Sequence, residues 1–123
     1  MRKKTFAVDI DGTITENGGG RIHLDALEAL RRLTIMGHDV IYVTGRSSVE
    51  AYLLSVFGGT RKIAVGENGG SISLDVDNHI LLGDIEECNQ AFELIKNNIE
   101  DVHKKPVFPR LTEVVLERTF DID

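Results

Sequence analysis

The stretch from Phe6 to Thr15 constrains the fold more than any other part of the chain. It reads Phe-Ala-Val-Asp-Ile-Asp-Gly-Thr-Ile-Thr, so an apolar run leads into two aspartates at positions i and i+2. Such a run predicts a strand that is buried on both faces of a parallel sheet. Open α/β sheets bind their ligands at the carboxyl ends of the strands, and we therefore expect Asp9 and Asp11 at the binding edge.

Asp9 and Asp11 also predict a particular chemistry. Two neighbouring carboxylates disfavour each other's ionisation, because like charges in one site raise one of the two pKa values. A hard divalent cation removes that conflict, and Mg2+ is commonly held by one or two carboxylates together with water and a substrate phosphate. One carboxylate can then attack phosphorus while the other transfers a proton to the leaving oxygen. A bare Asp-x-Asp pattern is, however, more often a strand that ends in an acidic turn.

A second predicted strand, Asp39–Val43, leads into Thr44-Gly45-Arg46-Ser47-Ser48. A right-handed strand-helix-strand crossover would bring Thr44 to the same sheet edge as Asp9. The alternative is that the residues from Thr44 to Ser48 cap the next helix, for which a serine is well suited. Both interpretations are compatible, because the N-terminus of a helix is itself an anion site.

The string Asp9-Ile10-Asp11-Gly12-Thr13 resembles the first motif of the haloacid dehalogenase superfamily of phosphohydrolases. The resemblance implies that Asp9 is the nucleophile that forms an aspartyl-phosphate, and that Asp11 is the general acid and base. It also implies a Mg2+ ion bound by Asp9 and by the backbone carbonyl of Asp11. Thr44 matches the second motif, a Thr or Ser that hydrogen-bonds the transferring phosphoryl group, and Gly45-Arg46 fits the usual continuation.

A third predicted strand, Lys62–Val65, ends in Gly66-Glu67-Asn68-Gly69-Gly70. This string resembles the one that leads into the cap in the Cof-type branch of the superfamily. That branch includes archaeal phosphoglycolate phosphatases and the sucrose- and mannosylglycerate-type phosphatases. Asn68 would then lie near the substrate, although Asn-Gly is also a turn signal by itself. The resemblance to the archaeal phosphoglycolate phosphatase type covers the whole chain, including the closing Phe120-Asp121-Ile122-Asp123.

The remaining pattern predicts an α/β protein. We expect part of a doubly wound, Rossmann-like parallel sheet, followed by the start of an α+β cap. The further elements that periodicity and turn signals predict are helices at Leu24–Met36, Val49–Phe57 and Glu86–Val102, a hairpin of Ser71–Leu74 with Ile80–Leu82, and a strand at Glu113–Arg118. Residues 1–74 would form the first half of the core, and residues 75–123 would begin an inserted cap.

The motifs favour a Mg2+-dependent phosphomonoesterase, and the resemblance makes 2-phosphoglycolate the expected substrate. A sugar-phosphate phosphatase of the same branch is the alternative enzyme, because the core motifs do not fix the substrate. A non-catalytic phosphate- or metal-binding domain of the receiver type is the alternative from another class, but a receiver carries a lone phosphoacceptor Asp at a mid-chain strand end. A dinucleotide-binding fold is disfavoured because no Gly-x-Gly-x-x-Gly follows the first strand.

The resemblance also predicts that this chain carries part of an active site. The superfamily's third motif is a lysine that pairs with Asp9 and the phosphate, and its fourth is an acidic pair that completes the metal site. Lys104 and Lys105 precede a proline-containing loop without strand-helix context, and Gly83-Asp84 lacks the second acid at the expected position. We therefore expect a truncated chain with weak or no activity alone, whose open sheet edge is covered by a second copy or by another chain.

Composition limits the class of partner. The chain has 123 residues, of which 41% are hydrophobic, and its net charge is -6. This acidity argues against nucleic acid, which needs clustered Lys and Arg, but allows a small phosphorylated metabolite. No apolar run approaches the roughly 20 residues of a membrane span and no signal-peptide core follows Met1-Arg2-Lys3-Lys4, so we expect a cytoplasmic protein that does not insert into membranes. The single cysteine, Cys88, excludes an intrachain disulfide.

Overall fold

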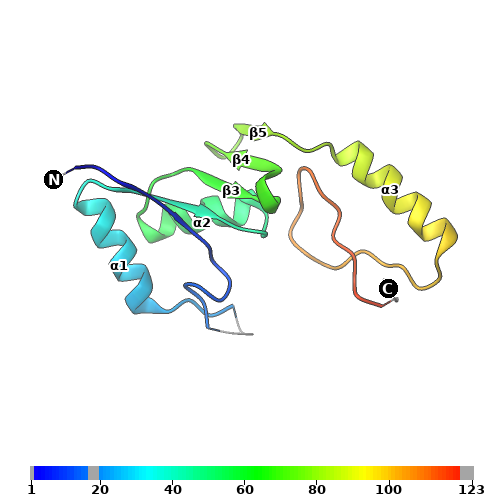
Figure 1. Ribbon diagram of the computed structural model, residues 1–123, viewed down its shortest axis with the longest axis horizontal. Helices are drawn as coiled ribbons and strands as arrows, with labels where there is room; N and C mark the ends of the chain where they lie inside the picture. The colour runs from blue at the N-terminus through cyan, green and yellow to red at the C-terminus, as the bar shows by residue number, and fades with distance from the viewer. Residues whose placement is uncertain (1, 17–19, 120–123) are drawn as a thin grey trace.

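The computed structural model describes residues 2–16 and 20–119 (Figure 1). Nine helices and strands follow one another along these ranges. They are β1 (Thr5–Val8), α1 (Leu24–Ile35), β2 (Asp39–Val43), α2 (Ser48–Gly58), β3 (Ala64–Gly66), the short 3-10 helix η1 (Glu67–Gly69), β4 (Ser71–Ser73), β5 (His79–Leu81) and α3 (Ile85–Asn98). None of the helices described here is long and apolar enough to cross a membrane.

The strands form one five-stranded sheet in the order β1-β2-β3-β4-β5. The first three strands pair in parallel, and β4 and β5 continue the sheet as an antiparallel hairpin. The predicted α/β class and the predicted hairpin are thus confirmed. The hairpin adds its strands directly to β3, so the sheet extends past the point where the parallel pattern stops.

Helices α1 and α2 pack on the same face of this sheet. Both crossovers step in the same direction, from β1 to β2 and then to β3, and right-handed crossovers of this kind place both helices on one side. The core on that face combines strand residues that are neighbours across the sheet with residues of both helices. It contains Val8, Ile10, Ile14, Ala26, Leu30, Tyr42, Ala51, Tyr52, Leu54 and Ala64.

Local signals end both helices and begin α2. α1 is followed by Gly37, which has a φ of 95° and lets the chain reverse towards β2. Ser47 begins α2 with a capping box, because its side chain accepts from the N–H of Glu50 while Glu50 accepts from the Ser47 N–H. Gly59 ends α2 in the left-handed conformation.

The other face of the sheet is partly uncovered, so the prediction that β1 is buried on both faces is wrong. Thr5 and Ala7 of β1 are exposed, and its remaining residues are half-buried, because β1 is an edge strand covered by helices on one face alone. Across β2 to β5, Val43, Val65, Ile72 and Ile80 align in one row on this second face, and Val43 and Ile80 are exposed. That a second copy or another chain covers the open sheet stays a prediction.

Helix α3 and the segment that follows it form a second cluster, on the side of the sheet away from α1 in Figure 1. Phe92 and Val102 are buried there, and the ammonium group of Lys104 lies 4.8 Å from the centroid of the Phe92 ring. The Cys88 thiol donates to the carbonyl of Thr112. The Cys88 bond ties residues 99–119, here called the C-terminal segment, to α3.

The predicted strand at Glu113–Arg118 is wrong. In the part of the chain that the structure describes, this stretch forms one isolated bridge, between Lys104 and Leu116. Its opposing stretch contains Pro106 and Pro109, and proline is found in sheets essentially only at edges and bulges, so a longer ladder is disfavoured here.

Two further boundaries differ from prediction by two or more residues. α3 ends at Asn98 instead of Val102, since Ile99 is extended and Asp101 has a φ of 59°. β3 begins at Ala64 instead of Lys62, because a turn joins the N–H of Ile63 to the carbonyl of Arg61. The closing residues 120–123, to which the resemblance extends, lie outside the described residues.

We predict that Gly66→Ala destabilises the fold far more than Gly37→Ala. A Cβ on Gly66 would lie 2.2 Å from the backbone nitrogen of Ser48, so β3 and α2 would have to separate. We expect a loss of ~3 kcal/mol or more in the free energy of unfolding, the upper range of overpacking. Gly37 has open space around it but a left-handed φ, so its replacement should cost about 1–2 kcal/mol.

Urea unfolding monitored by circular dichroism measures both variants against the parent chain. An equal loss in the two variants would show that the close approach of β3 to α2 is not a tight constraint.

Candidate active site

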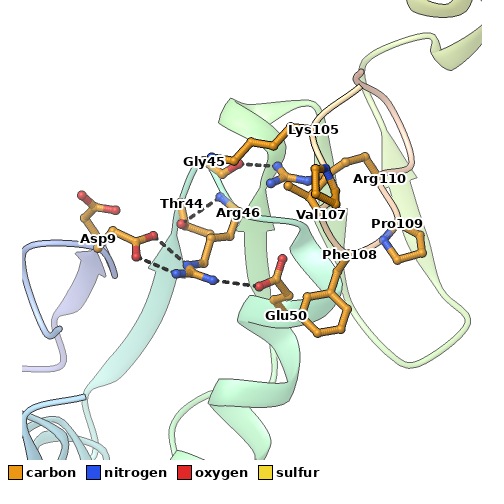
Figure 2. A pocket seen from close by; sticks show the side chains of 12 residues that line it. Asp9, Thr44, Gly45, Arg46, Glu50, Lys105, Val107, Phe108, Pro109 and Arg110 are labelled. Carbon is orange, nitrogen blue, oxygen red and sulfur yellow. Dashed lines mark hydrogen bonds and ion pairs between the residues drawn. The ribbon is translucent and has the colours of Figure 1, made fainter. Parts of the chain in front are cut away.

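A cavity of about 950 Å³ opens at the carboxyl ends of β1 and β2. Figure 2 shows Asp9 on one side of it, the C-terminal segment on the other, and Arg46 between them. The lining residues are Asp9, Asp11, Thr44, Gly45, Arg46, Glu50, Lys105, Pro106, Val107, Phe108, Pro109 and Arg110. The convergence of the first two motifs at one sheet edge is thus present in the structure.

A tight turn after β1 presents Asp9. The carbonyl of the buried residue Ile10 accepts from the N–H groups of Thr13 and Ile14, and Gly12 adopts a φ of 75° that favours glycine. One carboxylate oxygen of Asp9, Oδ1, accepts from the Ile10 N–H at 2.8 Å. This bond orients the exposed side chain and leaves Oδ2 without a hydrogen bond to the described residues.

Thr44 is buried at the end of β2 and held through its backbone and side chain. Its N–H donates to the carbonyl of Val65, and its carbonyl accepts from the N–H of Asn68. Its hydroxyl oxygen accepts from the N–H of Arg46 at 3.1 Å. The hydroxyl proton stays free to be donated, which suits an anionic ligand in the cavity.

Arg46 binds Asp11 through two parallel hydrogen bonds, Nε to Oδ2 at 2.7 Å and Nη2 to Oδ1 at 2.8 Å. Its remaining nitrogen, Nη1, donates to Glu50 at 3.0 Å. The hydrogen bonds from Arg46 lower the pKa of Asp11 below its usual value and outweigh the partial burial that would raise it. Asp11 is therefore held ionised in this state, without the proton that a general acid must donate.

Asn68 lies beside the cavity wall instead of on it. Its Oδ1 packs against Gly45, since a Cβ added to that glycine would lie 3.1 Å from it. Its Nδ2 donates to Oε2 of Glu113 at 3.5 Å. Asn68 has a φ of 56°, as expected for an Asn-Gly turn. The structure thus brings Asp9, Asp11, Thr44 and Gly45 together around the cavity and places Asn68 behind Gly45.

The C-terminal segment is attached to the core by Glu67, a residue that the sequence did not single out. Glu67 is buried, and its Oε1 accepts from Leu111 N–H at 2.9 Å, Thr112 N–H at 2.7 Å and the Thr112 hydroxyl at 2.9 Å. Thr112 fits against Gly70 and Gly83, where a Cβ would lie 2.3 Å and 2.8 Å from its side chain. A buried carboxylate needs such partners, so the contact fixes where the segment meets the sheet.

Arg110 makes a second attachment at the cavity itself. Its Nη1 donates both to the carbonyl of Gly45 and to the carboxylate of Glu113, as Figure 2 shows for Gly45. Neither Arg110 nor Glu67 belongs to a periodic pattern. The bonds that join the C-terminal segment to the core connect residues that are 44 or more positions apart in the sequence. Sequence spacing therefore gave no signal for them.

The groups that could hold a metal at the cavity are oxygens of Asp9 and Asp11. Asp9 contributes its carboxylate, and the backbone carbonyl of Asp11 accepts no hydrogen bond from the described residues. Within residues 2–16 and 20–119, no group of three or more His, Cys, Asp or Glu side chains could hold a metal. Two oxygen donors fit Mg2+, which commonly takes one or two carboxylates and fills its other positions with water and phosphate.

We predict that Arg46→Met raises the pKa of Asp11 in the metal-free protein. Because the pair lowers this pKa, it stabilises the fold above the usual Asp pKa and loses that effect as pH falls through the lowered value. Carboxyl carbon NMR of Asp11 measures the change directly. Arg32→Met, which removes the exposed pair with Glu28 on α1, is the matched control and should leave the Asp11 titration unchanged. An Asp11 titration that is identical in Arg46→Met would contradict the assignment.

A parallel sheet gathers two aspartates and a buried threonine at the carboxyl ends of its first two strands, where open α/β sheets bind their ligands. The chain belongs to the haloacid dehalogenase-like hydrolase family, whose model matches residues 6–116. The resemblance of the Asp9–Thr13 motif to this superfamily is thereby confirmed.

Curated relatives refine the comparison. The chain is 74% identical over 123 residues to a phosphoglycolate phosphatase of Nitrosopumilus maritimus, and 33% identical over 124 residues to one of Methanosarcina mazei. Each match covers 100% of this chain and 53% of the relative. The chain therefore spans about half the length of the curated relatives that it matches.

Solved structures agree on the fold. The crystal structure of Thermoplasma acidophilum 0175 superposes with a TM-score of 0.77 at 22% identity, over 92% of this chain and 49% of that one. A haloacid dehalogenase-like hydrolase from Bacteroides thetaiotaomicron superposes with a TM-score of 0.62 at 21% identity, over 79% of this chain and 38% of that one.

Proposed function

We propose that this chain supplies the nucleophile and the proton-transfer group of a Mg2+-dependent phosphomonoesterase that hydrolyses 2-phosphoglycolate. The observation that carries the reaction class is the meeting of Asp9, Asp11 and Thr44 at one cavity. The substrate is supported by relatives that are named phosphoglycolate phosphatase, one of them 74% identical over the whole of this chain.

The residues suggest a two-step reaction. Oδ2 of Asp9 attacks phosphorus and forms an aspartyl-phosphate, while Asp11 gives a proton to the leaving oxygen. Asp11 then takes a proton from the water that hydrolyses this intermediate. The Thr44 hydroxyl donates to a phosphoryl oxygen, where negative charge is concentrated during transfer.

Arg46 must release Asp11 for the first step. A carboxylate that accepts two hydrogen bonds from a guanidinium is held ionised, whereas a general acid must carry a proton. Glu50 remains a partner for Arg46 when Asp11 is released. Arg46 therefore suits the second step, in which Asp11 acts as the base.

The Asp9 carboxylate and the Asp11 carbonyl would hold Mg2+. When bound, the ion supplies positive charge that offsets the repulsion between the Asp9 carboxylate and the phosphate.

A sugar-phosphate phosphatase is the second candidate, because the exposed ring of Phe108 at the cavity wall offers an apolar face to a larger substrate. Relative rates on the two substrate classes decide between the candidates.

The test uses a chimera in which residues 1–123 are joined to the part of the Nitrosopumilus maritimus relative outside the match. Phosphate release is measured with 2-phosphoglycolate and a panel of sugar phosphates, in Mg2+ and in excess chelator. We expect Mg2+-dependent release that is fastest with 2-phosphoglycolate. The 123-residue chain alone, assayed beside the chimera, tests the expectation of weak activity.

Three outcomes would contradict parts of the proposal. A folded chimera that releases no phosphate would contradict the reaction, and a preference for sugar phosphates would favour the second candidate. Undiminished release in chelator would contradict the metal requirement.

We predict that Asp9→Asn abolishes turnover in the chimera, because an amide cannot form the aspartyl-phosphate. Asp11→Asn should slow turnover about 100- to 10,000-fold, the range typical of general acid-base catalysis. Asp77→Asn, on the exposed turn between β4 and β5, is a control that should retain full activity. Near-normal turnover by Asp9→Asn would refute the assigned nucleophile.

A further inference from the structure

Lys105 is a cation at the cavity without an assigned partner. Three basic side chains line the cavity, namely Arg46, Lys105 and Arg110. Arg46 is paired with Asp11 and Glu50, and Arg110 is paired with Glu113. Among the described residues, Lys105 forms no ion pair and no side-chain hydrogen bond, so its charge is available to a ligand.

The position of Lys105 is fixed by the fold of the C-terminal segment. Its backbone N–H donates to the carbonyl of Val115 at 2.8 Å, in the same stretch as the bridge between Lys104 and Leu116. Farther along, the bonds from Arg110 to Gly45 and from Thr112 to Glu67 hold the segment at the cavity. Lys105 is thus presented by an anchored backbone, and its flexible side chain can adjust to a ligand.

Lys105 lies across the cavity from the aspartates. Figure 2 shows it extending from the C-terminal segment towards Gly45, while Asp9 lies beyond Thr44 on the far side. A phosphate held at Asp9 and Thr44 would therefore share one cavity with the Lys105 ammonium, whose flexible side chain can reach towards a second group of the same molecule.

We propose that Lys105 binds a second anionic group, a carboxylate, on a small phosphomonoester substrate and so determines specificity. The inference rests on the proposed function and assigns the residue that separates its two candidate substrate classes. A neutral sugar leaves the ammonium unpaired, whereas a phosphorylated hydroxy acid neutralises it. An ammonium at the cavity wall therefore discriminates between the two classes by charge.

The phosphate itself is the competing anion for Lys105, and a matched substrate pair separates the two roles. Ethyl phosphate has the same length as 2-phosphoglycolate and carries a methyl group in place of the carboxylate. Loss of a carboxylate contact affects 2-phosphoglycolate alone, while loss of a phosphate contact affects both substrates equally.

The variants are Lys105→Met and Lys104→Met in the chimera. The neighbouring Lys104 is a matched control, because its ammonium lies over the Phe92 ring and does not line the cavity. Lys105→Met should raise the KM for 2-phosphoglycolate about 10- to 100-fold, the range for a hydrogen bond to a charged group, with little change in kcat. The KM for ethyl phosphate should not change, Lys105→Arg should restore most of the affinity, and Lys104→Met should behave as the parent.

Equilibrium binding gives a second readout that does not depend on turnover. In the Asp9→Asn background with Mg2+, titration calorimetry should show the same selective loss of 2-phosphoglycolate affinity on Lys105→Met. Equal losses for both ligands, or no loss for either, would overturn the inference. Binding through Lys105 without hydrolysis by the parent chimera would uphold the inference and refute the proposed function. Hydrolysis of 2-phosphoglycolate without a selective loss on Lys105→Met would uphold the proposed function and overturn the inference.

Discussion

The parallel pairing of β1 with β2 is the constraint on which the site depends. Val8 lies opposite Tyr42 in the register, so Asp9 and Thr44 leave the sheet at the same edge, within two residues of that pair. The buried core beneath Tyr42 fixes this register, because a slip of one residue would turn Tyr42 to the other face. The chemistry of the cavity is thus set by apolar packing that lies on the helix side of the sheet.

A charge network connects this edge to the rest of the molecule. Arg46 bridges the turn after β1 to the first turn of α2, through Asp11 and Glu50. Glu50 also completes the capping box of α2, so the same carboxylate begins a helix and orients the guanidinium. The state that results favours an ionised Asp11. In the proposed reaction, release of Asp11 by Arg46 would let Asp11 carry the proton that a general acid needs.

The sequence predicted what depends on local pattern. Strand β2, the helices α1 and α2, the hairpin, and the convergence of Asp9, Asp11, Thr44 and Gly45 followed from periodicity, caps and crossover handedness. It failed where long-range partners decide the outcome. Glu113–Arg118 has a strand-like composition but a proline-bearing neighbour, and β1 has an apolar pattern but an edge position. Glu67, Arg110 and the cavity position of Lys105 depend on contacts between distant segments, which no spacing encodes.

The most direct test of the central claim, that Asp9 is the nucleophile, is a crystal structure of the chimera with Mg2+ and fluoroberyllate. Fluoroberyllate imitates a phosphoryl group bonded to a carboxylate oxygen. We predict beryllium bonded to Oδ2 of Asp9, with a fluorine within hydrogen-bonding distance of the Thr44 hydroxyl. Beryllium bonded to Asp11, or bound away from both aspartates, would contradict the claim.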